Sequence, residues 1–181
     1  MNPAYQTYHL FVPKQAVGGS LVYFDLFNGA KTGLELLIWS VIPVVSGAVA
    51  VSGTLGVDLH LTRTTAVGTG GTAATREGTD TTAATVTNLT GGGDPLPGGV
   101  TARLTPSGGA TAGAVLGWTC VFTEETNDST YIAQNTNLVR RASSDDANLV
   151  VPVNTGIRVV QGTVASVGNI GFCVTFQTRP K

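Results

Sequence analysis

The chain has 181 residues, enough for one domain that buries a sizeable core without disulfides or metals. Charged residues make up only 12% of it, the net charge is −1, and no basic run occurs, which argues against an electrostatic nucleic-acid interface. Glycine, threonine and valine are plentiful, a composition that favours β-strands joined by tight loops.

Residues 1–19 are rich in aromatic side chains. They have no basic region followed by an apolar one, so the sequence predicts no signal peptide. We expect this stretch to be either an N-terminal arm that packs on a neighbouring subunit or an ordinary first strand. In the first case the residues expected at the interface are Tyr5, Tyr8, His9 and Phe11.

Two apolar runs follow, at residues 20–28 and 34–45, and both read as buried strands. The uncharged stretch 36–57 is long enough to span a bilayer. Pro43 and the pair Ser46-Gly47 divide it into short β-branched pieces, however, so we expect strands with turns and no membrane partner.

Residues 55–62 alternate strictly, with Leu55, Val57, Leu59 and Leu61 on one face. Their neighbours on the other face include Asp58 and His60. Side chains two apart in a strand project together, so this acid and this histidine are expected to lie side by side.

Residues 63–100 differ from their surroundings because 20 of these 38 positions are threonine or glycine. Such a segment cannot form much core, so we expect a long Thr/Gly-rich loop over the surface or against a neighbouring chain. Gly68, Gly70 and Ala73 match the dinucleotide-binding fingerprint G-x-G-x-x-G/A. The continuation is poor in helix formers, and a pyrophosphate site needs a helix there, so we expect no nucleotide site.

Alternation returns in two later strands, at residues 117–124 and 171–178. In the first, Trp118, Cys120 and Phe122 share a face, which is expected to be the core face. In the second, Phe172, Val174 and Phe176 are expected to point inward and Cys173 outward. Because the two cysteines then lie on different kinds of face, a disulfide between them is not expected.

Two further runs, at 147–153 and 156–164, read as buried strands, and 124–146 reads as a second polar excursion. With no helical stripe anywhere, the pattern predicts an all-β fold, an antiparallel β-sandwich or small barrel. We assign residues 20–181 to a single β-sandwich domain.

Few residues offer chemistry. Asp58 and His60 lack a serine or cysteine in identifiable relation, and a metal site would need a third ligand that the spacing does not supply. The carboxylate pairs Glu124-Glu125 and Asp145-Asp146 lie in polar loops, where solvent, a neighbouring subunit or calcium is their expected partner. Arg140 and Arg141 are expected to pair with Asp145 or Asp146 or with a neighbouring subunit. We therefore expect neither an enzyme nor a cofactor.

Four segments together carry a resemblance: FNGAKTGLELLIWSVIP, LHLTRTTAVGTGGTAAT, VTARLTPSGGATAGAVLG and LVVPVNTGIRVVQGTVASVGNIGFCVTFQ. In this pattern, which covers residues 20–178, the chain resembles small virion structural proteins of tailed bacteriophages, those with capsid and head-decoration roles. The resemblance implies a jelly-roll-like fold on the capsid surface and carries no catalytic residues. Because the chain ends in FQTRPK, it departs from the acidic or aromatic ending frequent in such proteins.

The resulting expectation is a non-enzymatic capsid decoration or cement protein that stabilises the head through intersubunit contacts. Its partners would be the major capsid protein and copies of itself, with a trimer expected from the capsid setting. Such a protein is assembled in the host cytoplasm and ends on the virion surface. The alternative is a phage fibre or receptor-binding head domain that recognises a host surface glycan. That function would need exposed aromatic and acidic residues, and neither Trp39 nor Trp118 is expected to be exposed.

Overall fold

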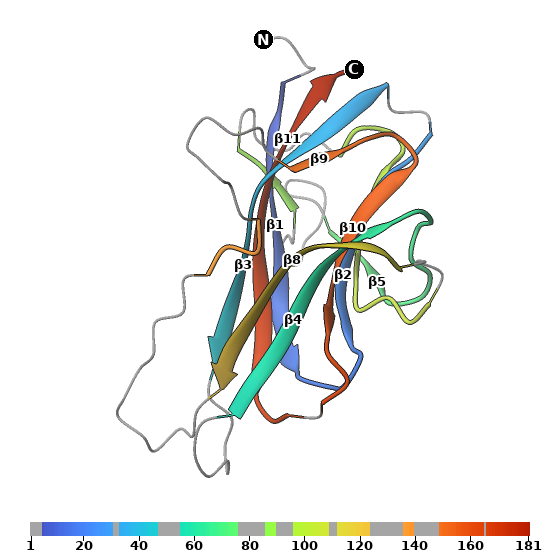
Figure 1. The fold of residues 1–181 in the computed structure, drawn as a ribbon. Coiled ribbons are helices and arrows are strands. Elements are labelled where there is room, and N and C mark those ends of the chain that lie inside the picture. Colours follow the sequence, from blue (N-terminus) through green and yellow to red (C-terminus); the bar gives the residue numbers. More distant parts are fainter. Residues whose placement is uncertain are drawn as a thin grey trace.

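The computed structural model describes residues 5–30, 33–46, 55–75, 86–89, 96–108, 112–123, 136–139, 149–164 and 166–181. Within these ranges every regular element is a β-strand, and all the strand pairs are antiparallel (Figure 1). The all-β class expected from the alternating patterns is therefore confirmed. The strands form two sheets in a sandwich-like arrangement around one core.

The first sheet, called here the five-strand sheet, is built around the end of the chain. Its order is β6 (Val86–Asn88), β1 (Thr7–Ala16), β11 (Asn169–Pro180), β3 (Leu34–Ser46) and β9 (Leu149–Val151). The central strand β11 pairs along its whole length with β3 and along most of it with β1. Strands so far apart in the sequence meet here because each has one strongly apolar face to bury.

The second sheet, the six-strand sheet, contains the remaining strands. Its order is β5 (Thr72–Ala73), β7 (Val100–Leu104), β2 (Val22–Asn28), β10 (Thr155–Gln161), β4 (Leu55–Thr64) and β8 (Ala112–Thr123). One edge is therefore the two-residue strand β5, and the other edge is the twelve-residue strand β8.

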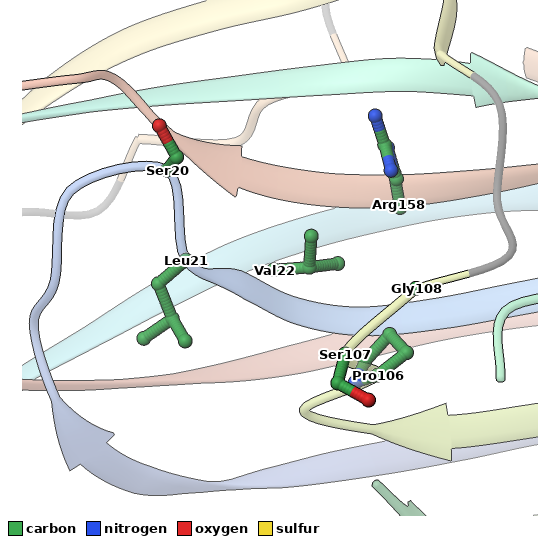
Figure 2. Close-up of a pocket in the computed structure, with 7 residues that line it drawn as sticks. All are labelled: Ser20, Leu21, Val22, Pro106, Ser107, Gly108 and Arg158. Atoms are coloured by element: carbon green, nitrogen blue, oxygen red, sulfur yellow. The ribbon is translucent and has the colours of Figure 1, made fainter. Parts of the chain in front are cut away.

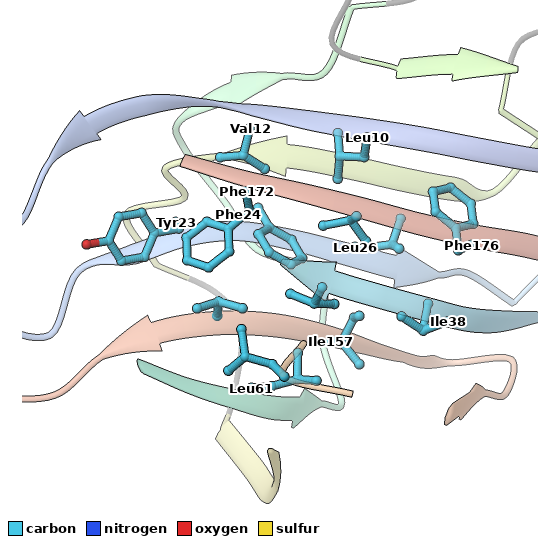
Figure 3. Close-up of a cluster of buried hydrophobic side chains, with 14 of the residues drawn as sticks. Leu10, Val12, Tyr23, Phe24, Leu26, Ile38, Leu61, Ile157, Phe172 and Phe176 are labelled. Atoms are coloured by element: carbon cyan, nitrogen blue, oxygen red, sulfur yellow. The ribbon is translucent and has the colours of Figure 1, made fainter. Parts of the chain in front are cut away.

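The core consists of the inward side chains of both sheets (Figure 3). On β11 the expected face is confirmed, because Phe172, Val174 and Phe176 are fully buried while Cys173 lies on the opposite side. The Phe172 ring packs edge-on against Tyr23 and Phe24 of β2, at centroid distances of 5.0 and 5.9 Å. These aromatic contacts join the two sheets directly.

The N-terminal stretch takes the second of its two expected forms, a first strand. Strand β1 lies between β11 and β6, and its inward residues Tyr8, Leu10 and Val12 are buried. The Tyr8 ring stacks on Phe176 at a centroid distance of 5.3 Å. Tyr8 is thus a core residue, and the expectation that it contacts a neighbouring subunit is wrong, because its side chain is already covered by its own chain.

Strand β8 faces the opposite way from the expected one. Thr119 and Val121 are buried, whereas Trp118, Cys120 and Phe122 are exposed. The reason is the register with β4, where Leu59 pairs with Thr119 and Val57 with Val121. Residues directly opposite in neighbouring strands share a face, so the buried leucine and valine of β4 turn Thr119 and Val121 inward.

The Thr/Gly-rich excursion 63–100 is more structured than a plain loop in the parts that the structure describes. It contributes β5 and β6 and begins β7. Strand β6 pairs with β1 in the five-strand sheet, and β5 pairs with β7 at the edge of the six-strand sheet. Val86 and Val100 are buried and anchor these additions to the core.

Two buried polar side chains, near opposite ends of the β2–β10 pair, fix the chain where it passes from one sheet to the other. The Asn28 amide donates to the carbonyl oxygens of Leu34 and Val151 across the sandwich, at 2.8 and 3.1 Å. The Gln161 Oε1 atom accepts from the Tyr23 hydroxyl and the Gly18 N–H, both at 2.9 Å. Buried polar atoms are costly unless they are paired, so these contacts specify how the chain crosses between sheets.

The uncharged stretch 36–57 supplies most of β3 and the start of β4 in the described residues. Among the residues described, no helix is long and apolar enough to cross a membrane.

The aromatic contact between the sheets gives a stability prediction. Replacing Phe172 with alanine should lower the free energy of unfolding by about 3–5 kcal/mol, because it removes a fully buried ring and leaves a cavity. Phe11 is the matched control, since it lies on the adjacent strand β1 with 41% of its surface exposed. Chemical denaturation should show F11A within about 1 kcal/mol of wild type. Equal losses for both variants would contradict this account of the core.

Candidate functional site

The outer surface of β4 and β8 carries the candidate site, which we call the Trp118 face. It consists of Gly56, Asp58 and His60 on β4 and of Trp118, Cys120 and Phe122 on β8. The register places Gly56 opposite Phe122, Asp58 opposite Cys120 and His60 opposite Trp118. All six therefore project from one side of the six-strand sheet, away from the core.

Asp58 is the centre of this face. Its Oδ1 atom accepts a hydrogen bond from the indole N–H of Trp118, and its Oδ2 atom lies 2.9 Å from Nε2 of His60. The expected proximity of Asp58 and His60 is thus confirmed, and Trp118 is a third member that the sequence assigned to the core. Both Asp58 and His60 remain more than one-third exposed.

Trp118 stands out from the sheet with 55% of its surface exposed, and Phe122 is 42% exposed. Gly162 follows β10 and lies next to Asp58, where a Cβ atom would come within 2.8 Å of Oδ2. The glycine thus leaves room for the carboxylate in the position from which it holds Trp118. What results is an exposed ring fixed beside an exposed acceptor, an arrangement suited to binding rather than to covalent chemistry.

A second carboxylate of the six-strand sheet, that of Asp25, is buried. Asp25 lies on β2 opposite Arg158 of β10 and Arg103 of β7, yet its side chain is fully buried. The loop 65–71 covers it, and the Gly68 N–H donates to Oδ2 at 2.8 Å. Burial raises the pKa of Asp25 above its usual range, against the opposing effects of Gly68, Arg158, Thr64 and Arg103.

This arrangement explains the glycine pattern at residues 68–73. Gly70 and Gly71 have φ values of 69° and 62°, the left-handed region that favours glycine. Gly68 has its N–H directed at the Asp25 carboxylate, so this amide is occupied by an anion of the chain itself. The described continuation is the strand β5 rather than a helix. The nucleotide-site pattern is thus the backbone of a cover over Asp25.

A pocket of about 260 Å³ lies beside this cover, between the start of β2, residues 106–108 and Arg158 (Figure 2). Its volume falls below the ~300–1,000 Å³ typical of small-molecule sites. The Arg158 guanidinium donates through Nε to the Thr62 hydroxyl at 3.4 Å and interacts electrostatically with Asp25. The one charged group of this pocket is therefore engaged within the chain, and the Trp118 face is the stronger candidate.

The structure describes four of the residues expected at an intersubunit interface. Tyr5 and Phe11 are exposed, His9 is half-buried, and Tyr8 is in the core. Phe11 pairs with Cys173, which in turn pairs with Ile42, so an apolar row crosses the outer surface of the five-strand sheet. Arg140 and Arg141 lie outside the described residues, as do the carboxylate pairs Glu124-Glu125 and Asp145-Asp146.

Both cysteines are free thiols, Cys120 on the six-strand sheet and Cys173 on the five-strand sheet. Their exposure differs from the expectation, because Cys120 lies on the Trp118 face and is exposed. Cys173 is half-buried, and burial raises the pKa of its thiol. Within the described ranges, no three His, Cys, Asp or Glu side chains come together in a way that could hold a metal ion.

Comparisons with protein-family models, with curated proteins and with solved structures found no match to this chain.

The glycine cover can be tested by a pair of alanine substitutions. At Gly71 a Cβ would come within 2.2 Å of the Leu104 carbonyl oxygen, whereas at Gly33, with a similar φ of 60°, it would meet nothing within 4 Å. G33A should therefore cost only the conformational penalty of about 1–2 kcal/mol. G71A should cost about 1–3 kcal/mol more in denaturant titrations, because backbone must move. Similar costs for both would contradict the close approach of β5 to β7.

Asp25 gives a pH-dependent prediction. Because its pKa is raised in the folded state, its contribution to stability is complete below the unfolded pKa, near 3.9, and is lost as the pH rises through the folded pKa. An asparagine can still accept from the Gly68 N–H but has no charge to desolvate. The unfolding free energy of D25N relative to wild type should therefore be greater at pH 7 than at pH 3.

The control for this experiment is D25A, which leaves the Gly68 N–H without its acceptor. It should be less stable than D25N by about 1–3 kcal/mol at either pH. Parallel stability profiles of D25N and wild type between pH 3 and pH 7 would show that the buried carboxyl does not titrate as described.

Proposed function

We propose that this chain is a non-enzymatic virion structural protein with a jelly-roll fold, a capsid decoration or cement protein of a tailed bacteriophage. It binds the head surface as a homo-oligomer, with a trimer as the expected state, and stabilises the head through contacts with the major capsid protein and with copies of itself. The single observation that carries the proposal is the order of strands in the two sheets.

Strands β5, β6 and β7 lie between β4 and β8 in the sequence and are additions to an eight-strand framework. The remaining eight strands are then counted from first to eighth along the chain. The five-strand sheet holds them in the order first, eighth, third, sixth, and the six-strand sheet in the order second, seventh, fourth, fifth. This interleaving supports the proposal of a two-sheet jelly roll, an architecture used by viral capsid proteins.

The surface supports the same proposal. Exposed aromatic side chains lie on the outer side of both sheets, Phe11 and Trp39 on one and Trp118 and Phe122 on the other. Large exposed apolar groups are a feature of protein–protein contact surfaces when they gather together. The low content of charged residues suits a lattice in which many individually weak contacts add up.

Electron microscopy of particles of the encoding virus tests this function. Antibodies to the chain, or difference maps between particles with and without it, should place many copies on the head. Adding the purified full chain to particles that lack it should restore this density and raise the temperature at which heads release DNA. Label confined to the tail tip, or absent from the particle, would overturn the proposal.

A second measurement uses the excursion 63–100. If neighbouring subunits cover it, residues 66–99 should be cleaved more slowly by protease in the assembled particle than in the isolated chain. Mass spectrometry of the fragments gives the cleavage rates, with a site elsewhere in the chain as the internal reference. Equal rates in both states would show that this segment takes no part in assembly.

A further inference from the structure

The Trp118 face has a property that a general apolar contact surface does not need. The exposed ring of Trp118 is held by its own N–H, which donates to Asp58 Oδ1, while Asp58 Oδ2 is held by His60. A side chain already fixed in one orientation loses less conformational entropy when a ligand binds to it. The indole is therefore an ordered platform on the outside of the protein.

The carboxylate that fixes the ring keeps binding capacity of its own. A carboxylate offers about four acceptor positions on its two oxygens, and Trp118 and His60 take one on each. The Asp58 side chain is 39% exposed, so the remaining positions can be reached from solvent. A ligand on the Trp118 ring would thus find hydrogen-bond acceptors at its edge.

A second aromatic ring extends the platform along β8. Phe122 is exposed on the same side as Trp118, and a spacing of four residues in a strand places them roughly 13 Å apart. Between them lies the exposed Cys120, opposite Asp58. Opposite Phe122 stands Gly56, which has no side chain to rise beside the ring. The face is therefore elongated, with a ring at each end and a carboxylate in the middle.

We propose that the Trp118 face binds a neutral oligosaccharide. A sugar ring has an apolar C–H side that packs on an aromatic ring and hydroxyls at its edge that donate to a carboxylate, which matches the pairing of Trp118 with Asp58. The backbone positions of Trp118 and Phe122 are separated by roughly 13 Å along β8, which is longer than one sugar unit, so the ligand is a chain of several units lying along this strand. The six residues of the face include a carboxylate and no lysine or arginine, which disfavours acidic sugars and phosphate-bearing ligands.

This inference does not depend on the proposed virion function, because it uses only the geometry of β4 and β8. The sequence placed Trp118 in the core and therefore disfavoured it as a sugar platform, whereas the structure exposes it. A second copy of this chain is the competing occupant of the face, and the experiment distinguishes the two.

The test uses Trp118 as its own reporter. The chain has two tryptophans, so W39F leaves Trp118 as the sole source of indole fluorescence. Neutral hexasaccharides of the cello, malto and chito series, with hexagalacturonate as the acidic comparison, are titrated into the full-length W39F chain. We expect at least one neutral series to shift the emission to the blue and to protect the indole from acrylamide quenching at millimolar concentration or below. Lack of protection by all three, or stronger protection by hexagalacturonate, would overturn the proposal.

Affinity measurements on matched variants then locate the site. Calorimetry with the binding hexasaccharide should show at least tenfold weaker binding for W118A and F122A, whereas W118F, which keeps a ring but loses the hydrogen bond to Asp58, should bind with intermediate affinity. Trp39 is the matched control, an equally large ring that is 40% exposed on the other sheet, and W39A should bind within twofold of wild type. Equal losses for W39A and W118A would overturn the assignment of the site.

Two controls separate lost sugar binding from unfolding and from a change of oligomeric state. Thermal unfolding must show W118A and W118F folded at the temperature of the binding experiment. Sedimentation without sugar must show the same oligomeric state for W118A as for wild type. A W118A chain that dissociates, combined with no binding of sugar to wild type, would assign the face to contact between copies and overturn the proposal.

Discussion

The burial of one side of β11 is the constraint on which the rest of the molecule depends. This strand lies between β1 and β3, and Phe172, at its inner face, packs against two aromatic rings of the other sheet. Side chains alternate along a strand, so once these residues are inside, the inner and outer sets of every strand in register with β11 are determined. The opposite sheet follows the same rule through the contacts of β2, β10 and β4. The Trp118 face is therefore a consequence of core packing as much as of its own residues.

Much of this could be predicted from the sequence, and where it could, the two sides of a strand differ clearly. In β4 and β11 large apolar residues alternate with polar ones, so both the strand and its buried side follow from the pattern. In β8 both sides are apolar, and the outer side carries the larger residues, Trp118 and Phe122. Hydrophobicity alone therefore predicts the wrong side of β8 as the buried one. Only the pairing with β4, which turns Val121 inward, decides it, and a pairing between strands some 60 residues apart leaves no local signal.

The absence of a local signal for tertiary pairing also explains why the sequence did not settle the role of β1 or the environment of Asp25. The alternation of Tyr8, Leu10 and Val12 is a visible strand signal, but its partner β11 lies at the other end of the sequence, so an arm and a strand could not be told apart. A single acid inside the apolar run of β2 was a signal that Asp25 is special. Its cover comes from Gly68, 43 residues later, in a segment whose composition indicated only a surface loop. At the candidate site, alternation along β4 predicted the acid and the histidine as neighbours, and tertiary register added the tryptophan.

The two sides of β8 are also under different evolutionary constraints. Thr119 and Val121 must fit a packed interior, where a change of even one methylene is felt. Trp118, Cys120 and Phe122 touch solvent, so substitutions there alter what the surface can recognise while the interior keeps its shape. Mutations at alternate positions of this edge strand can therefore change what the surface binds while the fold is retained. A lineage that carries this scaffold could change its ligands more quickly than its architecture.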